Sequence, residues 1–519
     1  MRLLIQRFIM AIILLSTMLT ISFATQYYVS TTGSDTNPGT ITLPFLTLSK
    51  AVGLSSLIPG DTIYIRGGTY ALGSTISISK LGTKDSLYHL FAYSGEQPVF
   101  NFSAQSSSDG IKANGNYWYI RGIESCYAAH NGIAVNGSNN IIENCSVHDN
   151  RNSGMQFGNG ASNNRVINCD SYYNYDPPAG GNADGFSPKL DVGTGNYFYG
   201  CRSWQNSDDG WDGYLRPSDS VYTTLENCWS FMNGYLKDGS PIATGNGNGF
   251  KMGGGDNSNS SQLRHYMTLK NCLCFDNRVK GFDQNNDRGT MILYNCTGYR
   301  NGTYNFSVPG AVRTGETLVI KNCISFASSG VTLGGVPSAV FATNSWPDSS
   351  TYPTSVSSAT SADFISVDTT GVRGPRKADS SLPEVKFMHL ALGSHFINAG
   401  TYVGLPLIGS APDLGCFEYN PICSVSSNAS ARPELQLFQN YPNPFNPSTT
   451  IVYQVAKPGM VSLTLYDVLG RDVVTLVNEV KPAGIYTAVW NAGGMPSGMY
   501  FSRLTSHGEQ MIRKMILMK

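Results

Sequence analysis

The segment IIENC (141–145) decides the fold, because variants of it recur along the chain at short intervals. The variants are VINC (166–169), FYGC (198–201), TLENC (224–228), TLKNC (268–272), ILYNC (292–296) and VIKNC (319–323). Gly154, Gly210 and Gly281 each lie nine residues after such a cysteine. Each repeat holds short β-type runs between polar turns, with no amphipathic helical stretch. A unit of this size cannot bury its own apolar face, so neighbours must stack. The repeat therefore predicts an all-β chain folded as a right-handed parallel β-helix.

Stacking places equivalent residues of successive repeats above one another, with about 4.8 Å between strands. The position after each glycine is expected to face inward, and it holds Ile133, Met155, Phe186, Trp211, Phe250, Phe282 and, where Asn305 takes the place of the glycine, Phe306. The cysteines that end the repeats predict a second internal stack of small apolar side chains. The chain has 11 cysteines, and a single disulfide among the others stays open. The asparagine before each cysteine, replaced once by Gly200, is expected to form a hydrogen-bonded ladder in the turn.

Two insertions lengthen one turn of the repeat. The spacing from cysteine to glycine grows to 16 residues between Cys169 and Gly185, and to 21 between Cys228 and Gly249. Both insertions enter the same turn and therefore the same edge of the stack. Insertions that gather on one face of a repeat array usually build its binding rim. We therefore expect a binding rim on this edge.

Composition narrows the class of protein. The chain of 519 residues has 35 Lys+Arg and 35 Asp+Glu, so its formal net charge is zero. A balanced chain has no global field that would attract nucleic acid, and any attraction for an anionic polymer must be local. Charged residues make up 13% of the chain and glycine contributes 56 residues, which is typical of a turn-rich extracellular β protein.

The first 24 residues have the layout of a secretory signal peptide. Arg2 and Arg7 precede an apolar run from Phe8 to Leu19, and small residues follow at Ser22 and Ala24. The run is short for a membrane span, although a retained signal anchor is the alternative. We therefore expect residues 1–24 to be a signal peptide and the chain to be secreted.

Four carboxylates are expected to converge on two adjacent coils. Asp184, Asp208 and Asp209 lie in the turn just before the glycine, and Asp212 lies two residues after it. Strand alternation should point the column two after the glycine to solvent, and this column holds Ala134, Gln156, Ser187, Asp212, Lys251, Asp283 and Ser307. Clustered carboxylates repel unless a hard cation lies among them, and oxygen ligands alone favour Ca²⁺ over Zn²⁺. The alternative is a ladder of aspartates that cap turns, since Asp-Gly is a common turn dipeptide.

Lys251 projects from the coil that follows these carboxylates. It could form an ordinary salt bridge with Asp212 and Asp283, which would keep it protonated. A bound dication would instead take up the carboxylate charge and lower the pKa of the lysine. The functional interpretation therefore makes the metal and a lysine base depend on each other.

The segments NADGF (182–186), NSDDGWDGY (206–214) and GNGFKM (247–252) resemble those of polysaccharide lyase family nine pectate lyases. The resemblance runs over roughly residues 26–420 and includes PGDTIYIRGGTY (59–70). It implies that a calcium ion is held by four aspartates, which match Asp184, Asp208, Asp209 and Asp212. It also implies that Lys251 is the Brønsted base, that the substrate is polygalacturonate or pectin, and that β-elimination yields 4,5-unsaturated products.

Exposed cations on the rim could bind further uronate carboxylates. The candidates are Lys189, Arg216, Lys237 and Arg288, each of which alone could equally be a solvated side chain. Two other functions stay open. One is a polygalacturonase-like hydrolase, although the Gly-His-Gly segment of those enzymes is absent. The other is a non-catalytic, glycan-binding surface β-helix. Solenoid enzymes of this kind are often monomers, which is the oligomeric state we expect.

The composition and the pattern of the sequence change after Cys423. A Ser/Ala-rich linker is expected over 424–436, after a catalytic β-helix domain over 25–423. Alternating runs and turns over 437–519 predict a small β-sandwich. The opening NYPNPFNPSTTI and the strand SGMYF resemble a C-terminal sorting domain of the bacterial type IX secretion pathway. The resemblance implies the secretion machinery as a partner and export through the outer membrane, and the alternative for these residues is a carbohydrate-binding module.

Overall fold

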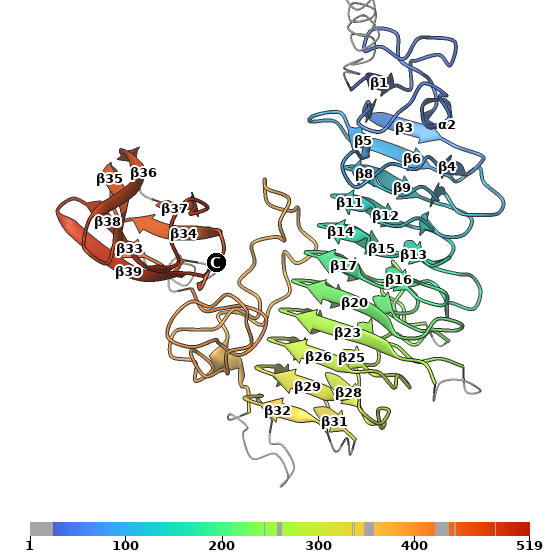
Figure 1. Cartoon of the computed structure of the whole chain (residues 1–519). Helices are drawn as coiled ribbons and strands as arrows, with labels where there is room; N and C mark the ends of the chain where they lie inside the picture. Colours follow the sequence, from blue (N-terminus) through green and yellow to red (C-terminus); the bar gives the residue numbers. More distant parts are fainter. Residues whose placement is uncertain are drawn as a thin grey trace, which may run out of the picture. The chain divides into compact units, whose positions relative to one another are not determined.

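The computed structural model describes residues 24–242, 244–256, 262–334, 336, 338–346, 358–420, 435–440, 443–482 and 484–518. Three long parallel sheets form the predicted right-handed β-helix (Figure 1). The proposed signal peptide, apart from Ala24, and most of the proposed linker lie outside the described residues. Among the residues that are described, no helix is both long and apolar enough to cross a membrane.

The strands of the three sheets are short, and nearly every coil contributes one strand to each sheet. Sheet 1 has twelve strands in the order β1 (Gln26–Val29), β2 (Thr62–Ile65), β5 (Tyr88–Ala92), β8 (Trp118–Arg121), β11 (Ile141–Glu143), β14 (Arg165–Ile167), β17 (Asn196–Tyr199), β20 (Val221–Glu226), β23 (His265–Lys270), β26 (Met291–Tyr294), β29 (Leu318–Lys321) and β32 (Val340–Ala342). Sheet 2 has ten, in the order β31 (Val331–Leu333), β28 (Phe306–Val308), β25 (Phe282–Asp283), β22 (Phe250–Lys251), β19 (Trp211–Asp212), β16 (Phe186–Pro188), β13 (Met155–Phe157), β10 (Ile133–Val135), β7 (Ile111–Ala113) and β4 (Ile76–Ile78). Sheet 3 has ten, in the order β3 (Gly68–Ala71), β6 (Pro98–Asn101), β9 (Glu124–Cys126), β12 (Ser146–His148), β15 (Asp170–Tyr172), β18 (Arg202–Trp204), β21 (Trp229–Phe231), β24 (Leu273–Phe275), β27 (Thr297–Tyr299) and β30 (Ile324–Phe326).

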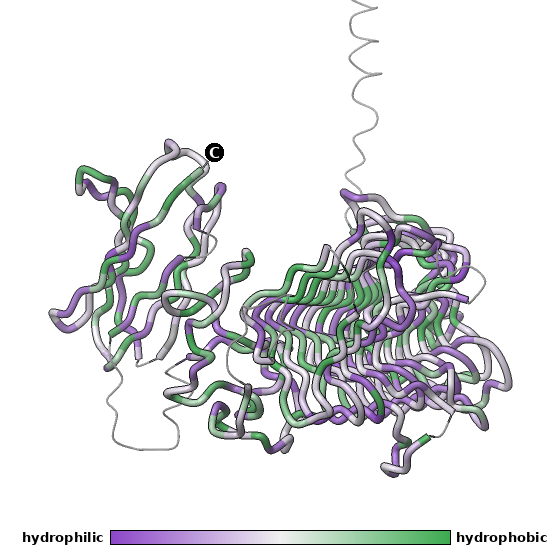
Figure 2. Tube along the Cα trace, turned by 90° about the horizontal axis from the view of Figure 1, so that it is seen from below, coloured by the Kyte–Doolittle hydropathy of each residue, from purple (hydrophilic) through white to green (hydrophobic). Residues whose placement is uncertain are grey.

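The column after each glycine faces inward, as predicted. Phe186, Trp211 and Phe250 are fully buried, and their rings stack with centroids 4.7 and 4.9 Å apart. The register pairs Trp211 with both neighbours, so each ring lies one strand spacing from the next. Apolar residues that repeat at the same place in successive coils appear as green bands in Figure 2. This stack holds in place the strands that carry the outward-facing side chains.

The cysteine stack is also confirmed. The cysteines that end the seven repeats are all at most 1% exposed, namely Cys145, Cys169, Cys201, Cys228, Cys272, Cys296 and Cys323. None of the ten cysteines among the described residues forms a disulfide, and Cys423 lies outside the described residues. The cysteines therefore act as small apolar core residues.

The expected ladder of the asparagines that precede the cysteines forms only in part: Asn322 Nδ2 donates to Asn295 Oδ1 at 3.0 Å. Asn144 and Asn168, which precede the cysteines, take left-handed backbone with φ of 53° and 52°, and their buried side-chain oxygens have no hydrogen-bond partner. Asparagine suits this turn because it tolerates positive φ, which explains why Gly200 can replace it at φ 63°. A longer ladder forms five residues after the cysteines, where the amides of Asn150, Asn174, Asn206 and Asn233 bond in series at 2.9, 2.8 and 3.0 Å.

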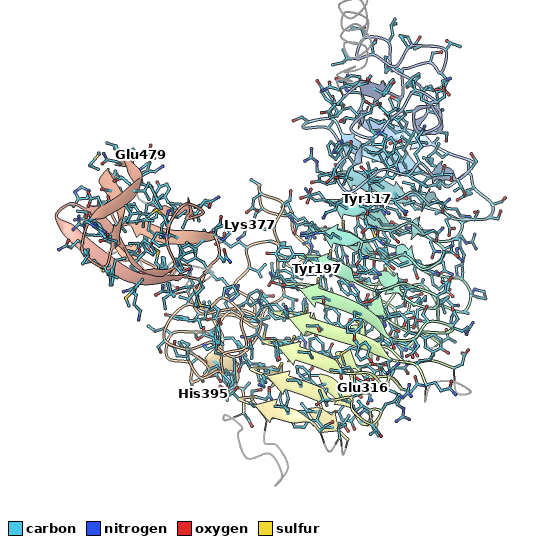
Figure 3. All side chains as sticks on the ribbon, viewed as in Figure 1. Tyr117, Tyr197, Glu316, Lys377, His395 and Glu479 are labelled. Carbon is cyan, nitrogen blue, oxygen red and sulfur yellow. The ribbon has the colours of Figure 1, made fainter. Side chains whose placement is uncertain are left out.

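The chain comprises two compact units. The first comprises the chain up to Thr224 and Ser230–His265, and the second comprises Leu225–Trp229 and everything from Tyr266 onward. The short helix α2 (Leu48–Val52) lies in the first unit, where the Thr47 hydroxyl caps it by accepting from Lys50 N at 3.1 Å. In the second unit Glu316, labelled in Figure 3, accepts hydrogen bonds from Tyr266 at 2.9 Å and Thr290 at 2.7 Å.

Residues 358–420 form no β-helix coil. Apart from the 3₁₀ turn η1 (Ser361–Asp363) they have little regular structure, and they pack on sheet 3 of the second unit. Phe387 contacts Phe275 and Tyr299 with ring centroids 4.7 and 5.5 Å away, and Phe417 contacts Trp229 at 6.2 Å. This segment covers aromatic residues that would otherwise be exposed on the outer face.

The C-terminal residues form the predicted sandwich of two antiparallel sheets. One sheet has the order β33 (Gln436–Leu437), β34 (Ser448–Val455) and β37 (Gly484–Asn491), and the other has the order β36 (Asp472–Lys481), β35 (Gly459–Asp467), β38 (Gly498–Ser506) and β39 (Glu509–Leu517). Trp490 is 4% exposed and packs between Phe445 and Tyr500, with centroids 5.3 and 5.1 Å away. A buried tryptophan offers no platform for a sugar, which weakens the carbohydrate-binding alternative.

Replacing Trp211 with alanine is expected to lower the free energy of unfolding by about 3–5 kcal/mol, because the fully buried ring has stacked neighbours on both sides. Chemical denaturation followed by circular dichroism would measure the loss. Tyr222→Ala is the control, since that ring is 56% exposed and its loss should change stability by about 0.5 kcal/mol or less. Equal effects of the two substitutions would contradict the importance of the stack.

Candidate active site and metal centre

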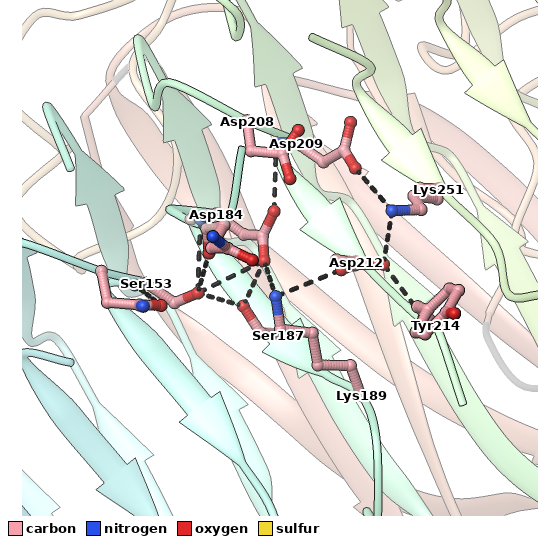
Figure 4. Close-up of polar contacts among 12 residues, drawn as sticks. Ser153, Asp184, Ser187, Lys189, Asp208, Asp209, Asp212, Tyr214 and Lys251 are labelled. Carbon is pink, nitrogen blue, oxygen red and sulfur yellow. Dashed lines mark hydrogen bonds and ion pairs between the residues drawn. The ribbon is translucent and has the colours of Figure 1, made fainter. Parts of the chain in front are cut away.

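Three neighbouring strands of sheet 2 carry the candidate site. β16, β19 and β22 place Ser187, Asp212 and Lys251 on the face opposite the aromatic stack, and Asp212 pairs in register with Lys251. Asp184 and the pair Asp208–Asp209 lie in the turns that lead into β16 and β19. Figure 4 shows these side chains pointing toward one another. The convergence of the four aspartates with Lys251 is therefore a feature of the fold.

Three of the aspartates form a compact group. One carboxylate oxygen from each of Asp184, Asp209 and Asp212 lies within 4.8 Å of the other two, and the three residues are at most 3% exposed. The fourth, Asp208, is 2% exposed beside them but is not a member of this group. Asp208 Oδ1 accepts the backbone N–H of Asn246 at 2.5 Å.

Hydrogen bonds fix the orientation of the carboxylates. Asp184 Oδ2 accepts from the hydroxyls of Ser187 at 2.9 Å and Ser153 at 3.3 Å. Asp184 Oδ1 accepts the backbone N–H of Asp209 at 3.1 Å. Asp209 Oδ1 in turn accepts from Asn248 N at 2.8 Å, so the second insertion contacts the site directly.

Two lysines lie among the aspartates. Lys251 Nζ is 3.2 Å from Asp209 Oδ2 and 3.3 Å from Asp212 Oδ1. Lys189 Nζ is 2.6 Å from Asp184 Oδ2 and 3.2 Å from Asp212 Oδ2. Lys189 was expected on an exposed rim, and that expectation is wrong, because the residue is 8% exposed. Its side chain extends into the cluster to compensate buried carboxylate charge.

The same enclosure corrects the expectation that the outward column faces solvent. Ser187, Asp212, Lys251, Asp283 and Ser307 are all at most 7% exposed. In the first unit their neighbours cover them: the two lysines pair with the aspartates, and the turn at 246–248 closes over Asp208 and Asp209. The alternation of the strand is as predicted, but the face that it presents is buried.

The cluster carries unbalanced negative charge. Burial raises the pKa of Asp184 despite Lys189, and burial and Asp209 raise that of Asp208 well above its usual value. Burial raises the pKa of Asp209 to about 7, against the opposing effect of Lys251. Only Asp212 has a lowered pKa: burial would raise it, but Lys251 and Lys189 outweigh that effect. Four carboxylates and two ammonium groups leave a formal charge of −2, which one divalent cation would neutralise.

The donor set also suits a hard divalent cation. The cluster offers carboxylate and hydroxyl oxygens, and neither cysteine nor histidine belongs to the group formed by Asp184, Asp209 and Asp212. Oxygen ligands in a buried, negatively charged site are those that Ca²⁺ prefers. The residues present therefore fit the calcium ion that the sequence predicted.

The remaining proposed cations do not join this cluster. Arg216 pairs with Asp256 at 2.9 Å, and Lys237 pairs with Asp149 at 2.8 Å. Arg288 belongs to the second unit, where its guanidinium donates to Ala311 O at 2.6 Å.

Sequence reasoning missed two residues that contact the site. Tyr214 donates its backbone N–H to Asp212 Oδ1 at 3.0 Å, its ring centroid lies 5.4 Å from Lys251 Nζ, and its hydroxyl donates to the Asp256 carboxylate. His265, fully buried, has Nδ1 2.7 Å from Gly213 O and Nε2 2.7 Å from the Thr223 hydroxyl. Tyr214 belongs to the quoted NSDDGWDGY segment and could have been noticed there. His265 begins a strand distant in the sequence, and no motif around it indicates that it lies near the site.

Acidification is expected to destabilise the fold through His265. Burial lowers the pKa of this histidine from 6.5 to about 4, so between these values the unfolded chain binds a proton that the folded chain does not. The contribution of His265 to stability should therefore fall by about 3 kcal/mol as the pH drops from about 6.5 to 4, while Asp209, whose pKa is raised to about 7, opposes this fall over the same range. Denaturation at a series of pH values would measure this slope. His265→Gln should remove this contribution to the pH dependence, and an unchanged slope in that variant would refute the assignment. Burial also lowers the pKa of His389 to about 4, so His389 adds a second contribution of the same sign.

Comparisons with known proteins agree with this architecture. Residues 27–328 match the family described as "Pel9A-like, right handed beta helix region", and residues 439–518 match the "Secretion system C-terminal sorting domain". The latter marks the chain for export by type IX secretion to the cell surface or the medium.

Similar proteins cover most of the chain. Pectate lyase L of Dickeya chrysanthemi is 39% identical over 409 residues, which are 76% of this chain and 90% of that protein. The crystal structure of pectate lyase Pel9A is similar with a TM-score of 0.68 and 37% identity, covering 77% of this chain and 98% of that one. The structure of a rhamnogalacturonan lyase is similar with a TM-score of 0.62 and 27% identity, covering 71% and 97%. On these grounds the chain belongs to the Pel9A-like family of right-handed β-helix proteins.

Proposed function

We propose that this protein is a calcium-dependent pectate lyase that cleaves polygalacturonate by β-elimination. The observation that carries the proposal is the position of Lys251, whose Nζ lies 3.2 and 3.3 Å from two carboxylates of a buried oxygen cluster. The pectate lyases among its relatives, similar over most of both chains, support the substrate class.

Asp184, Asp208, Asp209 and Asp212 would hold the calcium ion. When bound, calcium would neutralise the carboxylate of the sugar and so make the C5 proton of the galacturonate unit more acidic. Ser153 and Ser187 orient Asp184, and Asn246 and Asn248 orient the Asp208–Asp209 pair. These contacts keep the ligand oxygens in place, so little reorganisation is needed.

Lys251 would act as the base. Its neutral amine takes the C5 proton, the C5–H electron pair becomes the C4–C5 double bond, and the C4–O bond breaks. The departing oxygen takes a proton from solvent, which leaves one 4,5-unsaturated end and one new reducing end. No water is consumed, so a second catalytic carboxylate is unnecessary.

The charge of the cluster bears on this role. Burial alone would lower the pKa of Lys251, but Asp212, Asp209, Asp208 and Asp184 outweigh burial and raise it well above its usual value. A dication held by the same carboxylates would offset that attraction and so favour the neutral amine of Lys251. Lys251 is therefore expected to work as a base only in the calcium-loaded protein.

The geometry favours a lyase over an inverting hydrolase. Inverting hydrolysis needs two carboxyl groups about 6.5–9.5 Å apart to admit a water. Asp184, Asp209 and Asp212 instead offer oxygens within 4.8 Å of one another, and two lysines fill the space beside them. A passive glycan-binding stalk would have no use for such a costly buried charge cluster.

Among the other cations, Arg216 is best placed to bind a substrate carboxylate. Its side chain is 59% exposed, and its partner Asp256 also accepts from Tyr214, whose ring neighbours Lys251. Lys189 would act indirectly by holding Asp184 and Asp212. The data assign no such role to Arg288.

The decisive test is the growth of ultraviolet absorbance from unsaturated product when purified protein acts on polygalacturonate, with calcium and with a chelator. We expect absorbance only with calcium. New reducing ends without absorbance would indicate hydrolysis, and binding without cleavage would indicate a passive stalk. Size-exclusion chromatography with light scattering in the same buffer would test the proposed monomer.

We further propose that residues 25–423 suffice for catalysis and that residues 437–519 serve export alone, with 424–436 as the linker. The sandwich has its own buried core, which includes Leu463, Tyr500 and Leu504, so its removal should leave the catalytic domain folded. Deleting 437–519 is expected to abolish appearance of the protein outside the producing cell while leaving the specific activity of purified protein within about twofold. A large loss of specific activity would contradict this division.

A further inference from the structure

A second pocket lies in the first unit, away from the aspartate cluster. It has a volume of about 390 Å³, within the range of small-molecule sites, and three tyrosines, Tyr127, Tyr173 and Tyr175, contribute to its lining. Arg151 and Lys237 supply cations, and Asp149 and Asp238 supply carboxylates. None of the aspartates of the candidate metal centre lines it.

The two insertions of the repeat build this pocket together. Tyr175 and Pro177 come from the first insertion, and Leu236 to Asp238 come from the second. The insertions contact each other, since a Cβ on Gly180 would lie 2.8 Å from a methyl carbon of Ile242. Gln205 fastens the second insertion by donating to Leu236 O at 2.8 Å. The pocket is therefore formed largely by inserted residues that the β-helix coils themselves do not require.

The charges of the pocket leave one cation available. Lys237 Nζ is bound by Asp149 at 2.8 and 3.0 Å, and Asp149 also contacts His148 Nδ1 at 2.7 Å. Asp238 caps its own turn by accepting from Ser240. Arg151 is exposed and forms no ion pair with any residue of the described chain. Its guanidinium can therefore bind a carboxylate with two parallel hydrogen bonds.

The tyrosines suit a sugar ring. Tyr127 is 43% exposed, and Tyr173 and Tyr175 are half-buried, so ring surface is available beside Arg151. The Tyr173 ring is held by Lys237, whose Nζ lies 4.8 Å from its centroid. An aromatic surface next to a free guanidinium is complementary to a ring that carries a carboxylate.

We propose that this pocket is an accessory binding site for a uronate unit of an acidic polysaccharide, with Arg151 on the carboxylate and the tyrosines against the ring. The choice of a uronate rests on the proposed function. The site would hold a segment of the polymer that is not being cleaved, and would so raise affinity for long chains without taking part in chemistry.

The test is calorimetric titration of the full-length protein with trigalacturonate in the presence of a chelator. Cleavage is then blocked, and the aspartate cluster with its formal charge of −2 repels the ligand. We expect saturable binding that Arg151→Ala weakens about tenfold, as does replacement of the probe by uncharged galactotriose. Tyr173→Ala should weaken it to a similar degree.

Arg165→Ala is the matched control, because Arg165 is also an exposed arginine but lies on sheet 1, so this variant should bind the probe like the wild type. Absence of saturable binding, or equal binding by the Arg151 and Arg165 variants, would overturn the proposal. Binding is measured without catalysis, so a protein that fails to cleave polygalacturonate can still pass this test, and an active lyase can fail it.

Discussion

Lys251→Ala is expected to lower kcat on polygalacturonate by about 10²–10⁴-fold, because it removes the amine proposed to take the C5 proton. Lys251→Arg should be almost as inactive: it keeps a cation beside the carboxylates that Lys251 Nζ approaches to 3.2 and 3.3 Å, but a guanidinium does not release its proton at working pH. Initial rates of absorbance growth at saturating calcium would measure both losses.

The control for the lysine variants stands in the same column of sheet 2. Lys112 aligns in register with Ala134, and that column continues to Lys251. Among the described residues Lys112 forms an ion pair only with Asp109, at 3.4 Å, and its side chain is 35% exposed. Lys112→Ala should retain full activity. An active Lys251→Arg protein would show that the residue supplies charge rather than base catalysis, and the base would then have to be sought elsewhere.

Calcium is expected to stabilise the folded protein, and Asp209→Asn is expected to remove most of that effect. At a calcium concentration about 100 times the dissociation constant, the gain should be about 2.7 kcal/mol in the wild type. Asp209 is chosen because it contacts both Lys251 at 3.2 Å and Asn248 at 2.8 Å, so asparagine keeps its size while removing a charge. Thermal denaturation with calcium and with chelator would measure the difference.

Two comparisons make the calcium experiment specific. Asp219→Asn removes an aspartate that pairs with Arg264 at 2.7 Å at the surface, and should leave the calcium effect intact. Magnesium should stabilise less, because it demands near-ideal octahedral geometry and gives up its waters reluctantly, whereas calcium accepts irregular arrangements of oxygen ligands. If calcium raises the melting temperature of Asp209→Asn and wild type equally, the ion binds elsewhere and the proposed centre is wrong.

The columns of the β-helix were readable from the sequence for a simple physical reason. Stacked coils place the same kind of residue at equivalent positions. The aromatic residues Phe186, Trp211 and Phe250 recur at one offset from a glycine, and this recurrence indicates that they face the interior. The same reasoning predicted that Asp184, Asp209 and Asp212 lie close together, since residues at similar offsets in neighbouring repeats occupy neighbouring positions in the structure. The buried amide ladder had an equal signal, asparagine five residues after each cysteine from Asn150 to Asn301, but the Asn-Cys pair was the more conspicuous pattern.

The sequence by itself determined the repeat, the inward columns, the sandwich that follows and the coils on which the acidic residues meet. Only the tertiary structure decided that this acidic face is buried, that Lys189 extends into the cluster, and that His265 lies beneath Gly213. Repeat periodicity specifies position along and around the helix, but it carries no information on how irregular insertions fold back. Those insertions close over the carboxylates and build a second pocket. They do not follow the repeat, so their contacts could not be predicted from its periodicity.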